Sequence, residues 1–585
     1  MTTSNYPRAR FDDARQRLTR QLSNPVRTLI ATQLNEVHDV LDEVEEASRN
    51  GLYCAGYVSF EAAHAFSDGS QFVATPGSSP LAQFALFENC ETTPWGEGSF
   101  TYSTQAIWTC HTNENSYQEK VQSILNSITS GDVYQVNLTA MHHASGIDVN
   151  ELYAQLVTAQ QPAYGALLEF EDMAIVSGSP ELFFQWSENA LRTRPMKGTK
   201  SRGRFQQEDK EHALALQQSS KDQAENIMIV DLLRNDLGRV AKTGSVEVVE
   251  LCAIEGYPTV WQMVSEISCT TRNDVTLDAV FDALFPCGSV TGAPKSSALR
   301  IISELEDQPR GVYCGAIGLV EPQTSGIRAT FSVAIRTGEV RPSGDAKYGS
   351  GGGVVSDSTP KAEYDEMILK AEVLIKDTPA DLLETFRFVP GESNEHIKLH
   401  VSRLQSSAAQ LGHFVPVDVH EILDIELGKV VFNARVRLTL SMSGTLSIEC
   451  APAPEARDVV TLDFATVPVD STDRKLFHKT TNRDIYESRR LKNVDDVILI
   501  NERGECTETT IANFAVLLNG EWCTPPLSSG CLPGVERAVL LRQGVLQERV
   551  LFPQDVRDGK QIIVFNSLRG TESAELHAQV VLTVN

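Results

Sequence analysis

The sequence has no apolar run long enough to cross a membrane as a helix, because nowhere in its 585 residues do about 18 apolar residues follow one another. The N-terminal residues MTTSNYPRAR also lack the apolar core of a secretory signal peptide. Basic residues are scarce, since 51 Lys and Arg stand against 77 Asp and Glu and give a net charge of −26. This balance argues against nucleic acid as a partner, and we expect a cytoplasmic protein.

Cysteine patterns typical of metal or disulfide modules are absent too. The eleven cysteines show neither CxxC spacing nor the Cys/His spacing of a zinc site, and they are scattered through apolar segments. We therefore expect buried free thiols in a reducing compartment.

The remaining composition is that of a globular protein, with 41% hydrophobic and 22% charged residues, and the length predicts more than one domain. Helical periodicity, as at residues 117–128, is mixed with alternating strand patterns, as at residues 133–139. These elements follow no repeating βα unit and no short-period repeat. The pattern predicts a large layered α+β domain.

A domain boundary is expected at residues 375–381, where IKDTPAD combines a helix end with a short linker. No flexible Gly/Ser tether occurs there, so we expect the two domains to pack. We predict a first domain at residues 1–376, with its catalytic motifs at 117–376, and a second at residues 382–585.

Lys197 lies in the stretch RPMKGTK, at a bend where a strand is expected to turn through Gly198. Taken alone, the stretch is compatible with a basic surface loop. Two carboxylates bracket it in the sequence, Glu181 in SGSPE and Glu225 at the start of an apolar helix. A lysine has an ordinary pKa of about 10.4 and is no nucleophile at neutral pH unless burial or a neighbouring cation lowers that value. Lys197 is therefore a candidate nucleophile.

Two glycine-rich segments are suited to binding a small anion. Residues 287–295, CGSVTGAPK, form a turn that enters a helix, and residues 349–353, GSGGG, let backbone amides approach a ligand. Each pattern alone is more often structural. Arg336 follows an apolar strand and is suited to clamping a carboxylate with two hydrogen bonds.

Glu363 and Glu366 are three positions apart, so a helix would place them on one face. Together with Glu225 they would form a site made only of oxygen atoms, which suits Mg²⁺ better than a softer metal. The alternative for the pair is a solvated helix face.

Seven motifs, taken in order, resemble the chorismate-utilising enzymes. This family includes component I of anthranilate synthase and of aminodeoxychorismate synthase, and the isochorismate and salicylate synthases. The motifs cover roughly residues 117–376 and are SGSPELFF, RPMKGT, AENIMIVDLLRNDLGRV, FPCGSVTGAPKSSALRIISELE, YCGAIG, VAIRT and YGSGGGVVSDSTPKAEYDE. Lysine in the PxKGT motif, here Lys197, is typical of aminodeoxychorismate synthases, whereas anthranilate synthases typically have alanine. Anthranilate synthesis is therefore the alternative to aminodeoxychorismate synthesis.

The resemblance implies a reaction and a set of roles. Lys197 would attack C2 of chorismate, Glu181 would protonate the leaving C4 hydroxyl, and ammonia would add at C4 to give 4-amino-4-deoxychorismate. Mg²⁺ would be bound by Glu225, Glu363 and Glu366. Substrate contacts are implied for Thr291, Gly292, Arg336, Gly351, Gly352 and Gly353.

Two features limit what the resemblance implies for this chain. Gln262 stands where the family often has histidine, and glutamine cannot carry a proton near pH 7, so it receives no acid/base role. No cysteine lies on the Gly-rich elbow that a class I glutaminase uses. The resemblance therefore implies that a separate glutamine amidotransferase subunit supplies ammonia.

The C-terminal part carries a second set of candidate residues, in LLET (382–385), HVSRL (400–404), HKTTNR (478–483), ECTETTIANF (505–514) and LPGVER (532–537). Taken singly, Lys479 is more often a surface lysine, Arg403 a member of a rim ion pair and Glu508 a strand-end residue. Together they supply the amine, the carboxylate and the anion-binding groups that a pyridoxal 5'-phosphate (PLP) site requires.

In this order the segments resemble fold type IV PLP enzymes, the class of branched-chain aminotransferases, D-amino acid aminotransferases and aminodeoxychorismate lyases, over roughly residues 382–582. The resemblance implies that Lys479 binds the cofactor aldehyde and carries protons, and that Glu508 holds the pyridine nitrogen. The phosphate is assigned to Arg403, Thr509, Thr510, Gly534 and Val535. The strand that usually precedes the LLET segment is absent.

Fusion to a synthase suggests a lyase that releases pyruvate from 4-amino-4-deoxychorismate and leaves 4-aminobenzoate for folate synthesis, an argument by analogy. The alternative is a non-catalytic docking or dimerisation module. A homodimer formed through this second domain is a further prediction.

Overall fold

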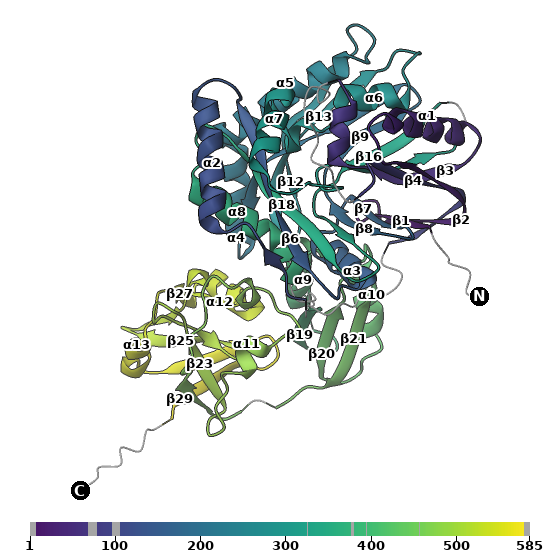
Figure 1. Cartoon of the computed structure of the whole chain (residues 1–585). Coiled ribbons are helices and arrows are strands. Elements are labelled where there is room, and N and C mark those ends of the chain that lie inside the picture. The colour runs from purple at the N-terminus through teal and green to yellow at the C-terminus, as the bar shows by residue number, and fades with distance from the viewer. Residues whose placement is uncertain are drawn as a thin grey trace. The chain divides into compact units, whose positions relative to one another are not determined.

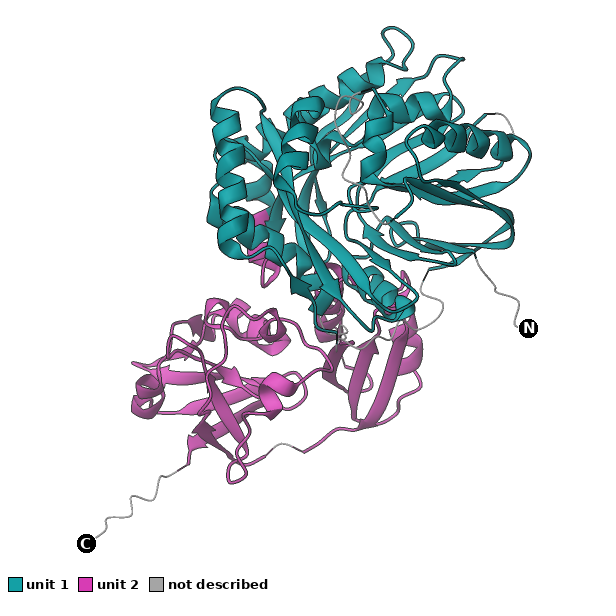
Figure 2. Cartoon of the chain, viewed as in Figure 1, with its two compact units in different colours: residues 1–201, 213–378 teal, residues 202–212, 379–585 magenta. Residues whose placement is uncertain are grey.

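The computed structural model describes residues 7–67, 79–95, 106–323, 326–375, 380–392, 395–455 and 457–577. The chain divides into two compact units, which Figure 2 shows in different colours. Unit 1 comprises Met1–Ser201 and Ala213–Thr378, and unit 2 comprises Arg202–His212 and Pro379–Asn585. Residues 376–379 of the predicted linker lie outside the described residues. Within the described part, no helix has the length and apolar character needed to cross a membrane.

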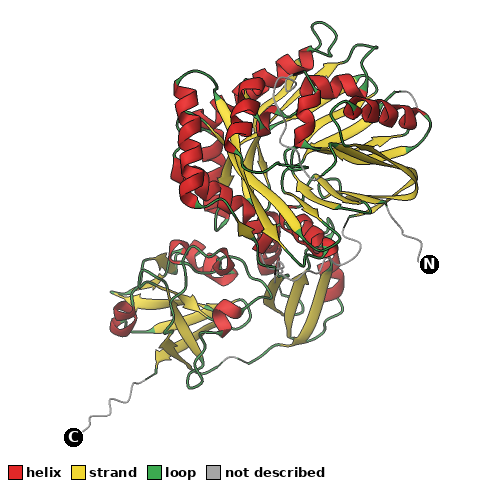
Figure 3. Ribbon diagram, in the orientation of Figure 1, coloured by secondary structure: helices red, strands yellow, loops and turns green. Residues whose placement is uncertain are grey.

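Unit 1 is built on one antiparallel sheet (Figure 1, Figure 3). Its pairings run in the order β12–β13–β10–β9–β16–β15–β3–β4–β2–β1–β7–β8–β17–β18–β6, with β11 also beside β13, and with β5 and β14 also beside β6. The strands are β1 (Arg8–Asp13), β2 (Leu18–Ala31), β3 (Tyr53–Val58), β4 (Ala82–Pro94), β5 (Thr109–Cys110), β6 (Gln135–Ala144), β7 (Tyr164–Glu169), β8 (Ala174–Ser179), β9 (Leu182–Ser187), β10 (Ala190–Arg194), β11 (Met196–Ser201), β12 (Glu247–Gly256), β13 (Val260–Thr270), β14 (Gly292–Ala293), β15 (Ala316–Glu321), β16 (Arg328–Val333), β17 (Thr337–Val340) and β18 (Ala346–Val354). Buried apolar residues of β3, β4 and β15 share one core with those of β1, β7 and β8, so the sheet folds back on itself.

Helices cover the outer faces of this sheet. They are α1 (Glu36–Arg49), α2 (Glu114–Thr129), α3 (Val149–Gln160), α5 (Ser220–Gly238), α6 (Leu277–Leu284), α7 (Lys295–Leu305) and α8 (Pro360–Ala371). Helix α4 (Gln206–Gln217) begins within the part of the chain that belongs to unit 2. Helix α1 packs on β2 and β4, α5 packs on β11 and β13, and α8 packs on β18. The main core of unit 1 lies between these helices and the sheet.

Unit 2 contains two sheets. The smaller one is antiparallel and consists of β19 (Leu382–Phe388), β20 (Ala434–Leu440) and β21 (Leu446–Pro452), and α9 (Glu395–Leu411) and α10 (Val419–Leu427) cover its apolar face. The larger one has the order β24-β23-β22-β29-β28-β25-β26-β27. Its strands are β22 (Val460–Phe464), β23 (Asp496–Ile500), β24 (Cys506–Thr509), β25 (Asn513–Leu518), β26 (Glu521–Thr524), β27 (Leu546–Glu548), β28 (Ile562–Asn566) and β29 (Gly570–Leu576), with helices α11 (Asp484–Glu487), α12 (Val535–Arg542) and α13 (Pro553–Asp558).

The predicted α+β class is confirmed by this mixture of helices and mostly antiparallel strands. The helix expected at residues 117–128 is confirmed as α2, which begins three residues earlier because Asn113 caps it by accepting a hydrogen bond from Ser116 N. The strand expected at residues 133–139 is β6, which begins at Gln135 and runs on to Ala144.

Arg310 is a buried cation that joins several elements of unit 1. It is 1% exposed and is paired with Glu306 at 2.8 Å. Its guanidinium also donates to the carbonyl oxygens of Val290 at 2.9 Å and Asn137 at 2.6 Å, and it lies 4.3 Å from the ring centre of Phe60. Since Val290 ends the short helix η2 (Gly288–Val290) and Asn137 belongs to β6, one side chain fixes the η2 turn against the sheet.

Replacing Arg310 with Met is expected to destabilise unit 1 by about 3–5 kcal/mol, because the Glu306 carboxylate would stay buried without its cation. Urea unfolding followed by tryptophan fluorescence measures the effect, since four of the five tryptophans (positions 95, 108, 186 and 261) belong to unit 1. Arg300→Met is the matched control. Arg300 pairs with Glu304 at 3.0 Å on an exposed helix face, so a change below about 1 kcal/mol is expected. Equal unfolding midpoints for the two variants would contradict the role of Arg310.

Candidate active sites

A cavity of about 420 Å³ in unit 1 brings together residues from distant parts of the chain. Its walls come from the β8–β9 turn, β11, α5, β18 and α8. Eight of the predicted catalytic, metal and substrate residues line it: Glu181, Lys197, Glu225, Arg336, Gly351, Gly353, Glu363 and Glu366.

Lys197 enters this cavity from an irregular part of β11. The pairing of β11 with β13 is interrupted between Met196 and Thr199, and Gly198 has a φ of 93°, a left-handed conformation that suits glycine. This bulge breaks the strand's alternation at Lys197. On the facing strand, a Cβ added to Gly353 would lie 2.4 Å from the Lys197 amine nitrogen. A glycine at position 353 therefore leaves the space that the amine occupies.

The charge state of Lys197 is set by opposing effects. Burial lowers the pKa of Lys197, the carboxylates of Glu225, Glu366 and Glu181 raise it, and the Lys370 ammonium lowers it, with lowering as the net result. Among the described residues, none forms a hydrogen bond or an ion pair with the Lys197 side chain. The amine lies deep in the cavity, although its side chain is partly open to it. Such an amine is easier to deprotonate than a solvated one and has no protein bond to break before it attacks.

Glu181 is a carboxyl that tends to keep its proton. It is 3% exposed, and burial raises the pKa of Glu181 to about 7. The Ser289 hydroxyl, which donates to Oε1 at 2.7 Å, and the charge of Lys197 oppose this rise. Ser289 belongs to the η2 turn that Arg310 holds in place. At neutral pH a large fraction of Glu181 is protonated, as a general acid requires.

The three predicted metal ligands are not gathered into a metal site. Glu363 and Glu366 both approach Gly352, where an added Cβ would lie 3.1 Å from Glu363 Oε2 and 3.4 Å from Glu366 Oε1. Glu366 is paired with Lys370 at 2.7 Å, and Glu363 accepts a hydrogen bond from Ser358 at 2.6 Å. In the described part of the chain, no group of three His, Cys, Asp or Glu residues is placed to hold a metal ion. The donors are of the type Mg²⁺ takes, but their arrangement is not a ready-made site.

Three predicted substrate contacts, Thr291, Gly292 and Gly352, are not among the residues that line the cavity. The Thr291 hydroxyl donates to the Cys287 carbonyl at 2.8 Å, and Gly292 pairs with Val136 of β6. A Cβ on Gly292 would lie 2.1 Å from the carbonyl oxygen of Gln135. Thr291 and Gly292 therefore take part in close packing of the turn against β6, and their predicted substrate contacts stay predictions.

Lys370 is a cavity residue that sequence reasoning missed. Its amine donates to the Gly351 carbonyl at 2.7 Å and pairs with Glu366, and its own carbonyl accepts from Arg336 at 2.5 Å. Arg336 itself is held with a φ of 53° between β16 and β17. The available signal was the spacing, because Lys370 is four residues after Glu366 on the same helix face.

Two glutamines lie near Lys197. Gln135 is fully buried, and neither its amide nitrogen nor its amide oxygen has a hydrogen-bond partner among the described residues. It lies beside the amine, because its nitrogen is 3.2 Å from the Cβ position of Gly353. Sequence reasoning missed it, although a glutamine within the strand pattern VYQVNL was a signal. Gln262 lines the cavity and accepts a hydrogen bond from Thr199 at 2.9 Å, a role that needs no proton transfer.

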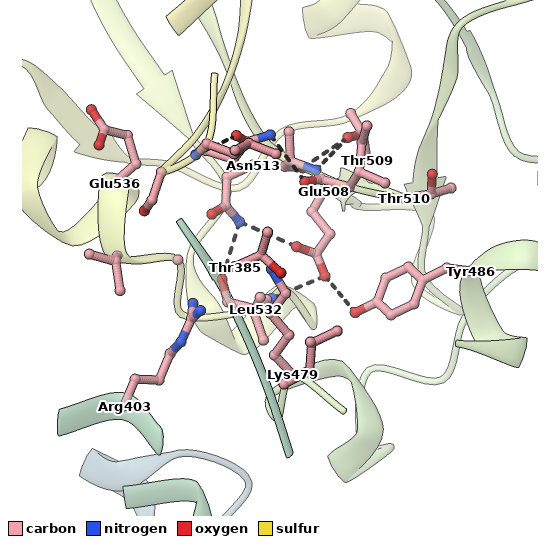
Figure 4. A pocket seen from close by; sticks show the side chains of 18 of the residues that line it. Thr385, Arg403, Lys479, Tyr486, Glu508, Thr509, Thr510, Asn513, Leu532 and Glu536 are labelled. Carbon is pink, nitrogen blue, oxygen red and sulfur yellow. Dashed lines mark hydrogen bonds between the residues drawn. The ribbon is translucent and has the colours of Figure 1, made fainter. Parts of the chain in front are cut away.

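A second cavity, of about 260 Å³, lies within unit 2 (Figure 4). The predicted cofactor residues that line it are Arg403, Lys479, Glu508, Thr509, Thr510, Gly534 and Val535. Lys479 lies before α11, and its backbone carbonyl accepts a hydrogen bond from Leu383 N of β19 at 2.9 Å. Burial and the cations of Arg403 and Arg483 lower the pKa of Lys479 to about 8, against the opposite effect of Glu384 and Glu508.

Glu508 is held at the end of β24 by three donors. The Tyr486 hydroxyl donates at 3.0 Å, Leu532 N at 3.1 Å and the Asn513 side chain at 3.3 Å (Figure 4). Burial raises the pKa of Glu508 to about 8, and these bonds and nearby cations only partly offset that rise. A buried carboxyl in a fixed orientation is suited to pairing with a protonated ring nitrogen. Sequence reasoning did not assign Tyr486, and no pattern pointed to it.

Arg403 is fixed at the other end of the cavity. It donates to both oxygens of Glu384, at 2.8 and 2.5 Å, and to the Pro533 carbonyl at 3.1 Å. Glu384 also contacts His400 Nδ1 at 2.6 Å; burial alone would raise its pKa, but these two partners lower the pKa of Glu384 to about 2. Three of the five guanidinium N–H groups of Arg403 are thus used, and about two remain for a ligand.

The predicted phosphate-binding residues all line the cavity but differ in the donors that they leave for an anion. Helix α12 begins at Val535, directly after Gly534, so its first-turn N–H groups have no partner within the helix and suit a phosphate. Thr509 and Thr510 line the cavity but donate elsewhere, Thr509 to the Ala512 carbonyl at 2.9 Å and Thr510 to Asp496 at 2.6 Å. Both hydroxyls thus donate within the protein in this structure, and the predicted contact of Thr509 and Thr510 with the phosphate stays a prediction. With an amine, a buried carboxyl, Arg403 and a helix N-terminus around one cavity, the residues fit PLP.

Comparisons with known proteins match two separate parts of the chain. A chorismate-binding enzyme profile matches residues 97–376, and an amino-transferase class IV profile matches residues 381–572. The chain is 42% identical over 271 residues to a probable chloroplastic aminodeoxychorismate synthase from Oryza sativa subsp. japonica, covering 45% of this chain and 30% of that relative. It is 41% identical over 277 residues to aminodeoxychorismate synthase component 1 from Escherichia coli K12, covering 47% of this chain and 60% of that relative. The chain thus spans less than two thirds of either relative.

The fold of unit 1 also has a solved counterpart. Anthranilate synthase component I from Streptococcus pneumoniae TIGR4 superposes with a TM-score of 0.55 at 24% identity, covering 62% of this chain and 92% of that protein. Residues 97–376 therefore form a domain of the chorismate-binding enzyme family, and residues 381–572 form a domain of the class IV aminotransferase family on the same chain.

Proposed function

We propose that the chain makes 4-aminobenzoate in two steps. Unit 1 replaces the C4 hydroxyl of chorismate with ammonia to give 4-amino-4-deoxychorismate, and unit 2 eliminates pyruvate from that product. The observation that carries the proposal is the Lys197 amine, which has a lowered pKa and shares a cavity with the carboxyl of Glu181, whose pKa is raised. The relatives named aminodeoxychorismate synthase support the same reaction.

The first step needs a nucleophile at one end of a conjugated diene and an acid at the hydroxyl on C4, the carbon next to the other end of that diene. The neutral Lys197 amine bonds to C2, the two double bonds shift, and the C4–O bond breaks as Glu181 gives its proton to the leaving hydroxyl. Ammonia then bonds to C4, the double bonds return, and the lysine leaves C2. The temporary bond at C2 directs ammonia to the para position.

Ammonia is supplied in this proposal by a separate glutamine amidotransferase subunit. The supporting observation is that the E. coli relative is named component 1. The free cysteines of the described residues give no support to an internal glutaminase, since burial raises the pKa of thiols such as Cys287 and Cys314 to about 12.

Mg²⁺ is part of the proposal for substrate binding only. Glu225, Glu363 and Glu366 would hold it, and Glu366 would first have to release Lys370. The ion would neutralise the ring carboxylate of chorismate. No step above depends on the metal.

The second step assigns protons to residues of unit 2. Bound PLP supplies an electron sink for the carbon that carries the substrate amine. Lys479 removes the C4 proton, the C3–O bond breaks, and enolpyruvate leaves as the ring becomes aromatic. Glu508 would hold the ring nitrogen of the cofactor, and Arg403 and the N-terminus of α12 would hold its phosphate. Tyr486, Leu532 and Asn513 keep Glu508 oriented for this role.

Lys197→Ala is expected to lower formation of 4-amino-4-deoxychorismate by more than about a thousandfold, because the residue is the proposed nucleophile. Remaining amination is expected at C2, which gives anthranilate. Incubation of the purified chain with chorismate and ammonium, followed by chromatography with mass detection, measures both products. Lys200→Ala is the control, since Lys200 lies on the same strand but does not line the cavity. Unchanged formation of 4-amino-4-deoxychorismate by Lys197→Ala would rule out the covalent step.

Lys479→Ala is expected to accumulate 4-amino-4-deoxychorismate and to form no 4-aminobenzoate in the same incubation, because the proton carrier of unit 2 is removed. Lys475→Ala, an exposed lysine four residues earlier, should behave as the wild type. Undiminished 4-aminobenzoate from Lys479→Ala would remove the lyase assignment.

Amination by unit 1 is expected to fall as the pH rises through about 7, because the proton that Glu181 gives to the leaving hydroxyl is lost there. Ser289→Ala removes a hydrogen bond that lowers this pKa, so the decline should move to higher pH. Rate against pH, measured with saturating ammonia at each pH, tests this. Ser303→Ala, whose hydroxyl is exposed on α7, is the control. A decline that stays in place in Ser289→Ala would show that another group titrates.

A further inference from the structure

A short segment from within the chorismate-binding domain sequence belongs structurally to unit 2. Residues Arg202–His212 lie inside the 97–376 match, yet they cluster with the class IV aminotransferase domain. Neither family match assigns them to that domain. The segment begins directly after β11 and includes the first turns of α4.

A buried ion pair between Arg202 and Asp209 joins the start of the segment to the first turn of α4. Arg202 donates to both oxygens of Asp209, at 2.8 and 2.7 Å, and Asp209 also accepts from Gly203 N at 2.8 Å. Arg202 is 8% exposed and Asp209 is 6% exposed. A Cβ on Gly203 would lie 2.2 Å from Asp209 N, so glycine is required for this closure. Such a compact, bidentate pair gives the segment a defined shape.

In this conformation Phe205 and Arg204 lie against the residues that precede Lys479. The Phe205 and Phe477 rings lie 5.6 Å apart, and the Arg204 guanidinium lies 5.5 Å from the Phe477 ring centre. Arg204 also donates to the Ser471 carbonyl at 3.0 Å. Phe205 packs against the apolar cluster that contains Leu476 and Phe477.

Phe477 is separated from Lys479 by a single residue. It is 1% exposed, so its position is fixed by packing. On the other side of Lys479, Leu383 N donates to the Lys479 carbonyl at 2.9 Å and Thr481 N donates to the Asp381 carbonyl at 2.8 Å. The backbone that carries the amine is therefore held by β19 on one side and by Phe205 and Arg204 on the other.

We propose that Arg202–His212 is a positioning element of the PLP site, which holds residues 476–479 so that the Lys479 amine meets the cofactor aldehyde. The inference rests on the proposed cofactor role of Lys479. It means that cofactor binding by the class IV domain depends on residues encoded within the chorismate-binding domain. Phe205 is the central residue, because its ring packs on the ring of Phe477, two residues before Lys479.

The test uses the full-length chain. PLP is removed, and the apoprotein is titrated with PLP while the visible absorbance of the lysine-bound cofactor is followed. Phe205→Ala is expected to raise the dissociation constant by about tenfold or more, since small misplacement of a reacting group is costly. It should also shift the pH midpoint of the absorbance band, which reports the surroundings of the Lys479 nitrogen. Phe205→Leu keeps apolar packing and should restore most of the affinity.

Two controls separate positioning from loss of the fold. Gln207→Ala changes an exposed side chain of the same segment and should leave affinity and pH midpoint unchanged. Chorismate consumption should persist in all three variants if unit 1 stays folded. Wild-type affinity and an unshifted midpoint in Phe205→Ala would overturn the inference. Absence of any visible band in the wild-type chain would instead overturn the proposed function of unit 2, and the inference with it.

Discussion

Removing a lysine amine from water while carboxylates remain nearby is the constraint on which both cavities depend. Burial favours the neutral amine, whereas each carboxylate favours the ammonium ion, so the pKa of the lysine depends on the difference between these two opposing effects. For Lys197 burial prevails over Glu225, Glu366 and Glu181. For Lys479 the nearby arginines act in the same direction as burial. In both units the amine is held by rigid backbone, the β11 bulge in one and the contacts of β19 in the other.

The same balance between burial and neighbouring charges gives buried glutamates opposite roles. Glu181 and Glu508 are buried with too few cationic partners, and their pKa values rise to about 7 and 8. Glu384 is equally buried, but Arg403 and His400 lower its pKa to about 2, so it serves as a fixed anion. Glu384 thereby directs Arg403 toward the α12 N-terminus and leaves the remaining N–H groups for a ligand. The surroundings of a glutamate therefore decide whether it keeps its proton and serves as an acid or stays ionised and fixes a cation.

Sequence reasoning found the residues whose role follows from their own chemistry. Lys197, Glu181, Lys479 and Glu508 were identified in this way, and each lines a cavity. It could not say which neighbour a group meets in the fold. The hydroxyls of Thr509 and Thr510 were assigned to a ligand, whereas in this structure the Ala512 carbonyl and Asp496 accept their hydrogen bonds. Gln135 and Lys370 were missed because their local signals, a glutamine within a strand pattern and a lysine four residues after Glu366, do not say that the fold brings them near Lys197.

The segment Arg202–His212 shows the same limit at the level of domains. The sequence pattern assigns Arg202–His212 to the first domain, together with the strand before it and the helix after it. Domain boundaries are normally expected in linkers, and no linker pattern flanks this segment. Its contacts are non-local, and the hydrogen bond from Arg204 to Ser471 spans 267 positions. The free-energy cost of such a long-range contact is modest, because the entropy lost in closing a loop grows only with the logarithm of its length. The intervening chain is also mostly folded. The contact can form only once the chain up to Ser471 has been synthesised, so unit 2 packs with a segment that is made before its own strands.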